Sequence, residues 1–115
     1  MKVILDKTKV SIDIQDEKTG TNAFWVAAYF GQGECMGLLA SYGADILSKH
    51  KETGSNALHI AIKRKHYKVA EMLINSDFPV NDKMIGGISP LLLCCGDLDL
   101  LKIAKLLIEF GADIN

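Results

Sequence analysis

Apolar and polar positions follow one pattern three times along this chain of 115 residues. Each copy opens with a glycine, has a polar residue two positions later and then continues with apolar residues at helical spacing. The leading glycines Gly20, Gly54 and Gly87 are separated by 34 (54 − 20) and 33 (87 − 54) residues. A nearly constant period of this length indicates a repeat array.

The first part of each copy predicts a turn and then a short helix. The glycine allows positive φ in the turn, and a side-chain oxygen two residues later can cap the N-terminus of a helix. Pro90 falls at the first helical position, where its missing N–H does no harm. The capping residues are Asn22, Asn56 and Ser89, and the residues expected to face inward are Phe24, Ala27 and Ala28, then Leu58, Ala61 and Ile62, then Leu91, Cys94 and Cys95.

A second helix is predicted after a brief turn in each copy, and Gly31 closes the first helix of the first copy. Gly43 and Gly111 suit left-handed C-terminal caps, with Asp77 as the substitute in the middle copy. Isolated helices shorter than about 12–15 residues are marginal in water, so these short helices must stack. The apolar stripes expected on the second helices are Cys35, Leu38 and Leu39, then Val69, Met72 and Leu73, then Ile103, Leu106 and Leu107.

The three copies resemble the ankyrin repeat family, whose pattern is Gly-x-Thr-Pro-Leu-His-x-Ala-Ala, a turn, Leu-Leu and Gly-Ala-Asp-Val-Asn. The resemblance implies an all-α solenoid of stacked helix-turn-helix repeats joined by β-hairpin-like finger loops. The family's His is kept as His59 and replaced by Trp25 and Leu92. The turn Asp expected three residues before the glycine reads Glu17, Lys51 and Met84. The best matches are Asn56-Ala57-Leu58-His59-Ile60-Ala61, Ser89-Pro90-Leu91, Gly43-Ala44-Asp45-Ile46 and Gly111-Ala112-Asp113-Ile114-Asn115.

The domain organisation expected from this register is a single ankyrin repeat domain over residues 1–115. It consists of a partial N-terminal repeat at 1–13 and full repeats at 14–47, 48–81 and 82–115. Both ends interrupt the repeat pattern, which suggests either a piece of a longer array or an array with unusual ends.

The resemblance implies a non-catalytic module or scaffold that binds a partner protein through the concave face and the finger loops. The two residues after the small pair of each first helix should line up across the repeats. Tyr29 and Phe30 are the sharpest candidates, because adjacent exposed aromatics beside Arg64 resemble a binding hot spot; the alternative is packing against a neighbouring loop. The remaining candidates are Lys63 and Asp97 on the helices, Asp16, Lys18 and Thr19 on the first finger, His50, Glu52 and Thr53 on the second, and Lys83 and Ile85 on the third.

Charge is unevenly distributed although the net charge is −1. Residues 48–81 carry six Lys and Arg against three Asp and Glu, a local balance of +3, and the repeats on either side are negative. A charged partner could recognise this positive band. The alternative is an ordinary solvated face.

Other chemistry finds little support in the sequence. No nucleophile, base and orienting group are implied by spacing, so we expect no enzyme and no cofactor. His59 is expected to make structural hydrogen bonds, since one His alone is no metal site. The odd number of thiols on periodic apolar positions favours reduced core cysteines over disulfides or redox chemistry. Nucleic acid is the less favoured partner, because no aromatic stacking platform accompanies the basic Lys63-Arg64-Lys65-His66.

The sequence also bears on location and context. The longest apolar run, Pro90 to Cys95, is far shorter than a membrane span, and no signal-peptide core follows Met1. An intracellular, cytoplasmic protein is therefore expected, with the nucleus as the alternative. A second functional hypothesis is that the chain is the targeting or regulatory portion of a larger enzyme, channel or effector. The identity of the partner and the oligomeric state do not follow from the sequence.

Overall fold

The structure is a computed structural model that describes residues 14–112, so the partial repeat predicted at 1–13 lies outside the described residues. Short helices joined by long loops make up this part of the chain, and it contains no strand. The elements are α2 (Ala23–Tyr29), α3 (Gly33–Ser41), α4 (Ala57–Lys63), α5 (Tyr67–Asn75), α6 (Pro90–Cys94), the 3₁₀ helix η1 (Leu98–Leu100) and α7 (Leu101–Glu109).

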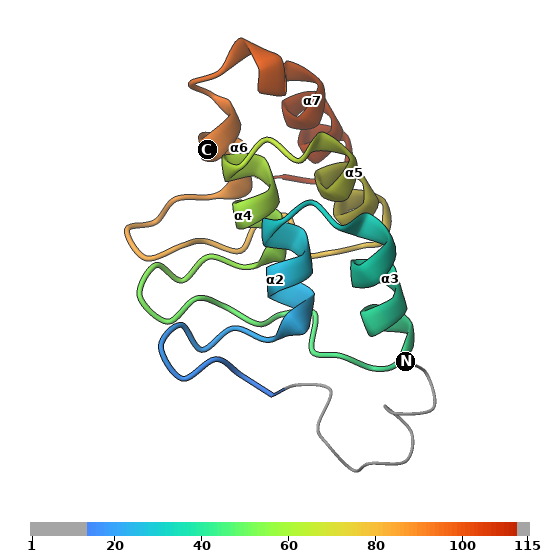
Figure 1. Ribbon diagram of the computed structural model, residues 1–115. Helices are drawn as coiled ribbons and strands as arrows, with labels where there is room; N and C mark the ends of the chain where they lie inside the picture. Colours follow the sequence, from blue (N-terminus) through green and yellow to red (C-terminus); the bar gives the residue numbers. More distant parts are fainter. Residues whose placement is uncertain (1–13, 113–115) are drawn as a thin grey trace.

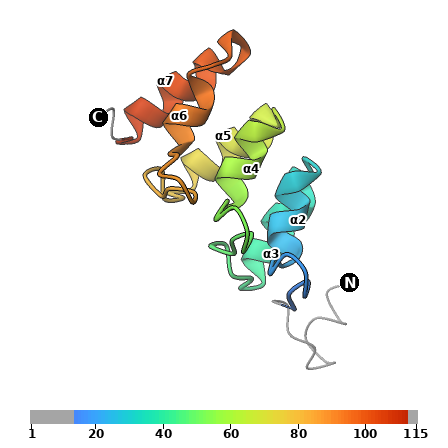
Figure 2. The same cartoon turned by 90° about the vertical axis from the view of Figure 1, so that its left-hand side faces the viewer.

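The helices form three stacked pairs, α2 with α3, α4 with α5, and α6 with α7 (Figure 1). The first helices of the pairs form one row and the second helices form a parallel row beside it, while the loops between pairs project as fingers from the side of the first row. The view turned by 90° shows the pairs as successive layers (Figure 2). The result is an elongated body of 45 × 25 × 21 Å, and the predicted all-α solenoid is confirmed.

The predicted N-terminal caps are confirmed. The Oδ1 atoms of Asn22 and Asn56 accept hydrogen bonds from the backbone N–H three residues later at 3.1 and 2.9 Å. The Oγ atom of Ser89 does the same at 3.2 Å, and Pro90 is the first residue of α6. Each side chain satisfies a backbone donor that a helix end otherwise leaves unpaired.

Left-handed backbone terminates the helices as the sequence predicts. The residues after the second helices, Gly43, Asp77 and Gly111, have φ of 87°, 61° and 93°. Gly31, which follows α2, has φ of 72°, and a Cβ atom there would lie only 2.6 Å from Nδ1 of His66. Lys65 has the same left-handed conformation after α4, with φ of 62°, so the close approach of the imidazole is what favours glycine at position 31.

The fingers are connected by backbone hydrogen bonds. Lys51 N–H donates to the carbonyl of Thr19 at 2.8 Å, and Ile85 N–H donates to that of Thr53 at 2.9 Å. The first two fingers close over five residues, as in the 2.8 Å bond from Asp16 N–H to the Thr21 carbonyl. The third finger closes over four, from Met84 N–H to the Ile88 carbonyl at 2.8 Å, which reflects its one-residue deletion.

This finger geometry corrects the expected position of the turn acceptor. The acceptor in the first finger is Asp16, whose Oδ1 accepts from the N–H groups of Lys18 and Thr19 at 2.8 and 3.2 Å. In the second finger, Nδ1 of His50 accepts from Glu52 N–H at 3.2 Å. The turn acceptor was expected three residues before Gly20 and Gly54, at positions 17 and 51, and this was wrong by one residue. In these two fingers, which are one residue longer than the third, the acceptor lies four residues before the glycine.

The inward face predicted for the first helices is largely confirmed. Phe24, Ala27 and Ala28 of α2, Leu58, Ala61 and Ile62 of α4, and Cys94 of α6 are buried. The third of these first helices, α6, departs from the prediction, because Leu91 is half-buried and Cys95, just after the helix, is exposed. α4 covers α2 and α6 covers α4, whereas no further layer covers α6 within residues 14–112.

The second helices required a larger correction. Leu39, Val69, Leu73, Ile103 and Leu107 are buried and Leu106 is half-buried, but Cys35, Leu38 and Met72 are exposed. The buried face of α5 runs through Val69, Ala70, Leu73 and Ile74, so position 72 and its equivalent 38 fall on its edge. Val69 lies against Gly33 of the preceding layer, and Cys35 has no such layer among the described residues.

Candidate protein-binding groove

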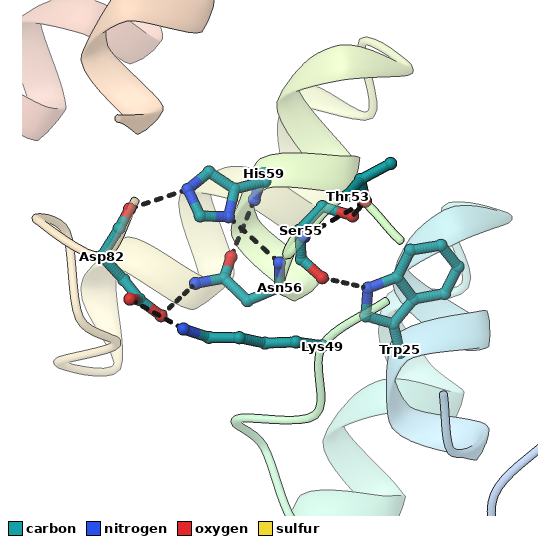
Figure 3. A network of polar contacts seen from close by, with 7 residues as sticks. All are labelled: Trp25, Lys49, Thr53, Ser55, Asn56, His59 and Asp82. Carbon is teal, nitrogen blue, oxygen red and sulfur yellow. Dashed lines mark hydrogen bonds and ion pairs between the residues drawn. The ribbon is translucent and has the colours of Figure 1, made fainter. Parts of the chain in front are cut away.

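The imidazole of His59 fixes the third finger to α4 (Figure 3). The residue is completely buried, and its Nδ1 accepts from Asn56 N–H at 3.0 Å. Because Nδ1 is the acceptor, the ring is neutral with its proton on Nε2, which donates to the Asp82 carbonyl at 2.7 Å. Asn56 Oδ1 accepts in turn from His59 N–H, which completes a reciprocal capping box. His59 therefore makes the structural hydrogen bonds that its place in the motif predicts.

The carboxylate of Asp82 extends this network to the preceding junction. Lys49 Nζ lies 2.9 Å from its Oδ1, and Asn56 Nδ2 donates to its Oδ2 at 3.1 Å. Burial on its own raises the pKa of Asp82, but these two contacts outweigh burial and hold the pKa below its ordinary value. The negative charge of Asp82 is thus retained at the base of the third finger (Figure 3).

Trp25 replaces the histidine in the first pair and binds a different part of the next finger. Its indole Nε1–H donates to the Ser55 carbonyl at 2.8 Å, and the side chain is buried to 6% exposure. Trp25 offers no acceptor to Asn22 N–H, which donates instead to Ser48 Oγ at 3.2 Å. The substitution therefore preserves a hydrogen bond between layers and places a large aromatic surface between the first two fingers.

An aromatic cluster starts from this indole. The Tyr29 ring stacks on Trp25 with centroids 5.6 Å apart, and Phe30 meets Tyr29 edge-on at 5.0 Å. The imidazole of His50 also lies near Trp25, with ring centroids 5.7 Å apart. The guanidinium carbon of Arg64 lies 4.1 Å from the centroid of Tyr29, and Nη1 donates to Tyr29 Oη at 3.2 Å. Tyr29 thus contacts both Trp25 and Arg64, whereas Phe30 is 62% exposed.

The four rings of this cluster line a groove of about 450 Å³ between the first two fingers and the helices α2 and α4. Many of the binding residues predicted from the sequence meet there. The lining consists of Asp16, Thr19, Thr21, Trp25, Val26, Tyr29, Phe30, His50, Thr53, Ser55, Ile60 and Lys63. We call this the finger groove.

Other predicted residues lie outside the finger groove. Arg64 lines an adjoining hollow together with Lys65, and it shares Tyr29, Ile60 and Lys63 with the finger groove. Lys18, Glu52, Lys83 and Ile85 are exposed on the fingers. Asp97 lines neither the finger groove nor this adjoining hollow. It instead pairs with Lys65 Nζ at 2.7 Å and accepts from Asp99 N–H at the start of η1.

Sequence reasoning missed part of the floor of the groove. Val26 and Ile60 occupy the same position in α2 and α4, one residue after Trp25 and His59. The sequence signal for this floor was that both helices carry an apolar residue at this position, although it is not one of the residues predicted to face inward. Trp25 is a buried wall of the groove that supports Tyr29.

Comparison with known proteins decides the family. The family model described as ankyrin repeats (3 copies) matches over residues 1–84 and over residues 24–115. This chain belongs to the ankyrin repeat family. Ankyrin repeats are protein–protein interaction modules, so the chain carries such a module.

Relatives of this ankyrin array include much larger proteins. The chain is 28% identical over 113 residues to the nuclear factor NF-kappa-B p105 subunit of Mus musculus, which covers 96% of the chain and 12% of that protein. It is 34% identical over 97 residues to the ankyrin repeat and KH domain-containing protein mask-1 of Caenorhabditis elegans, and this match covers 84% of the chain and 4% of mask-1. A 36-residue stretch is 47% identical to the I-Kappa-B like protein C1 of Microplitis demolitor bracovirus, and this match covers 31% of the chain and 21% of that protein. The ankyrin array thus spans a small part of the relatives it matches.

The cysteines of the ankyrin array are free thiols in residues 14–112, but they are not all core residues. Cys94 is buried, and burial, followed by the neighbouring Cys95, raises its pKa to about 11. Cys35 and Cys95 are exposed, so the expectation of three core cysteines was wrong for these two. The described residues contain no group of three or more His, Cys, Asp or Glu placed to hold a metal ion. None of the helices between residues 14 and 112 has the length and apolar character needed to span a membrane.

Burial of His59 predicts a loss of stability in mild acid. Removal from water disfavours the imidazolium and lowers the pKa of His59 below 6.5, despite the opposing effects of the Asp82 carbonyl and carboxylate. The unfolded chain therefore takes up a proton before the folded chain does. The contribution of His59 is fully present above pH 6.5 and is lost as the pH falls from there through the lower folded pKa.

We expect the urea midpoint followed by circular dichroism to fall between pH 7 and pH 5 in the wild-type protein. His59→Gln keeps an amide acceptor for the capping box and removes the titration, so its midpoint should change less over the same interval. Lowered folded pKa values of Asp82 and Asp97 cause a second decline below pH 3.8 in both proteins. An equal slope in both proteins between pH 7 and pH 5 would contradict the assignment to His59.

Proposed function

We propose that this ankyrin array is a non-catalytic module that binds a partner protein through the finger groove. Membership of the ankyrin repeat family supports the class of function, and the finger groove is the surface that we propose for it. Its floor and walls come from two successive layers, so a partner docking there contacts both. The scaffold role, the absence of catalysis and an intracellular location, cytoplasmic or nuclear, are parts of the same proposal.

One observation carries the proposal, namely the large exposure of Phe30 on a supported aromatic base. Phe30 is 62% exposed and rests edge-on against Tyr29, which itself contacts Trp25 and Arg64. A rigid aromatic anchor loses little side-chain freedom on binding and buries a large apolar area. Binding hot spots are enriched in such residues.

We expect Phe30→Ala to weaken binding of the natural partner by about 2 kcal/mol, or roughly 30-fold in Kd. Phe110→Ala is the matched control, because Phe110 is 42% exposed at the end of α7 and does not line the finger groove. Partner captured from the source of the protein would be titrated by calorimetry against both variants, with circular dichroism confirming the fold. Equal binding by Phe30→Ala and wild type would refute the groove as the binding site.

The second candidate function is that of a targeting or regulatory portion of a larger enzyme, channel or effector. It is favoured by the small share of the relatives that the chain covers, 12% of the p105 subunit and 4% of mask-1. In that case the array would bind a partner as proposed, and the remainder of the protein would determine the consequence. The transcript around this coding region decides between the two, since a catalytic or channel domain in the same reading frame would establish the second.

A further inference from the structure

The charges around the finger groove are separated by sign. Among the residues that line it, Asp16 comes from the first finger and Lys63 is the last residue of α4. Each first helix starts at a finger loop and ends at the turn to the second helix (Figure 1), so Asp16 precedes α2 on the finger side and Lys63 ends α4 on the side of that turn. Val26 and Ile60 belong to α2 and α4, and Phe30 is the C-cap residue of α2, at the same end of its helix as Lys63 in α4.

The positive end is available to a partner. Lys63 and Arg64 are exposed, and no ion pair within residues 14–112 involves either of them. Arg64 donates from Nη1 to Tyr29 Oη, and its guanidinium carries further N–H donors that a partner can use. Lys65, the next basic residue, differs because Asp97 neutralises it at 2.7 Å.

The negative end is fixed in place. Asp16 Oδ1 is held by the N–H groups of Lys18 and Thr19, and these bonds lower the pKa of its carboxyl. The carboxylate is therefore charged at neutral pH and repels an acidic group near the first finger. The charges of Lys18 and Lys51 also lower this pKa, while Lys51 directs its Nζ to the Glu17 carbonyl.

We propose that the finger groove binds an extended protein segment with an apolar anchor on Phe30 and an acidic side chain next to it on the Lys63 and Arg64 side. This inference rests on the proposed function and adds the chemistry of the partner. Charge complementarity determines the direction of the segment as well as its composition, because an acidic group placed toward Asp16 would be repelled. Asp and Glu suit Arg64 especially, since a carboxylate can accept two parallel guanidinium hydrogen bonds.

A random 12-residue peptide library displayed on phage tests the proposal directly. Selection on the wild-type protein should enrich peptides that carry an apolar residue and an Asp or Glu near it. The acidic residue should always be on the same side, either N-terminal or C-terminal to the apolar one. Selection on Lys63→Glu/Arg64→Glu should instead enrich Lys or Arg at that place. The wild-type peptides should bind this double variant at least 10-fold more weakly. The control is Lys68→Glu/Lys105→Glu, which changes the net charge by the same amount at exposed positions of α5 and α7 in the second row of helices. This variant should select the same peptides as the wild-type protein.

The outcomes separate this inference from the proposed function. Peptides that lose binding in Phe30→Ala but show no acidic preference would overturn the inference and leave the groove as a protein-binding site. Peptides that bind Phe30→Ala as well as wild type, or no enrichment over beads without protein, would count against both. Binding of a labelled 20-residue oligothymidine that is lost in Lys63→Glu/Arg64→Glu, without peptide enrichment, would assign the groove to nucleic acid and also overturn the inference.

Discussion

Replacing His59 with alanine is expected to lower the free energy of unfolding by about 4 kcal/mol. The ring is completely buried, so its loss leaves a cavity beneath the third finger. Asn56 N–H and the Asp82 carbonyl also lose their 3.0 and 2.7 Å partners. An unsatisfied buried polar group costs roughly 1–3 kcal/mol, and two such groups with the cavity give the stated total.

Urea unfolding followed by circular dichroism at pH 7.5 measures this change. His50→Ala is the control, because His50 is half-buried and its Nδ1 accepts a single bond from Glu52 N–H in an exposed turn. We expect a cost of about 1 kcal/mol for that variant. If His59→Ala cost no more than His50→Ala, the His59 network would not be what joins the third finger to α4.

Replacing Leu58 with alanine is expected to cost about 3 kcal/mol. Leu58 is completely buried in α4, the middle helix of the first row, which contacts both α2 and α6. Loss of its side chain leaves a cavity between layers that cannot close, because short helices on both sides depend on the same contacts. The equivalent Leu91→Ala in α6 should cost about 1 kcal/mol, since Leu91 is only half-buried.

The same urea titration compares these variants with Leu98→Ala. Leu98 is 91% exposed in η1, so its replacement should change the free energy of unfolding by less than about 0.5 kcal/mol. A cost for Leu58→Ala as small as that for Leu98→Ala would show that the layers do not support one another through the first row.

The local structure could be predicted from the sequence because it depends on residues close together in the chain. The three caps at Asn22, Asn56 and Ser89 and the left-handed position of Asp77 were predicted from their order relative to short apolar runs. These features rely on bonds within one turn of backbone. The fold class followed because helices this short are stable only in a stack.

Features that depend on contacts between layers were harder to predict. Cys35 and Cys95 lie on the predicted apolar stripes yet are exposed, because burial at those positions requires a neighbouring layer. The groove was located in part, through Tyr29, Phe30 and Lys63, but its wall at Trp25 was not. The pairing of Trp25 with the Ser55 carbonyl spans 30 residues and has no counterpart in the His59 pattern, so the spacing alone could not predict it.

The third finger shows that tip length is independent of the alignment of the layers. It is closed by one residue fewer than its neighbours, yet Ile85 N–H bonds to the Thr53 carbonyl as Lys51 N–H bonds to that of Thr19. Insertions and deletions at the tips can therefore accumulate while the helices remain stacked. An engineer could graft loops of different lengths at these three tips, and natural variation there could change what the array recognises without cost to the scaffold.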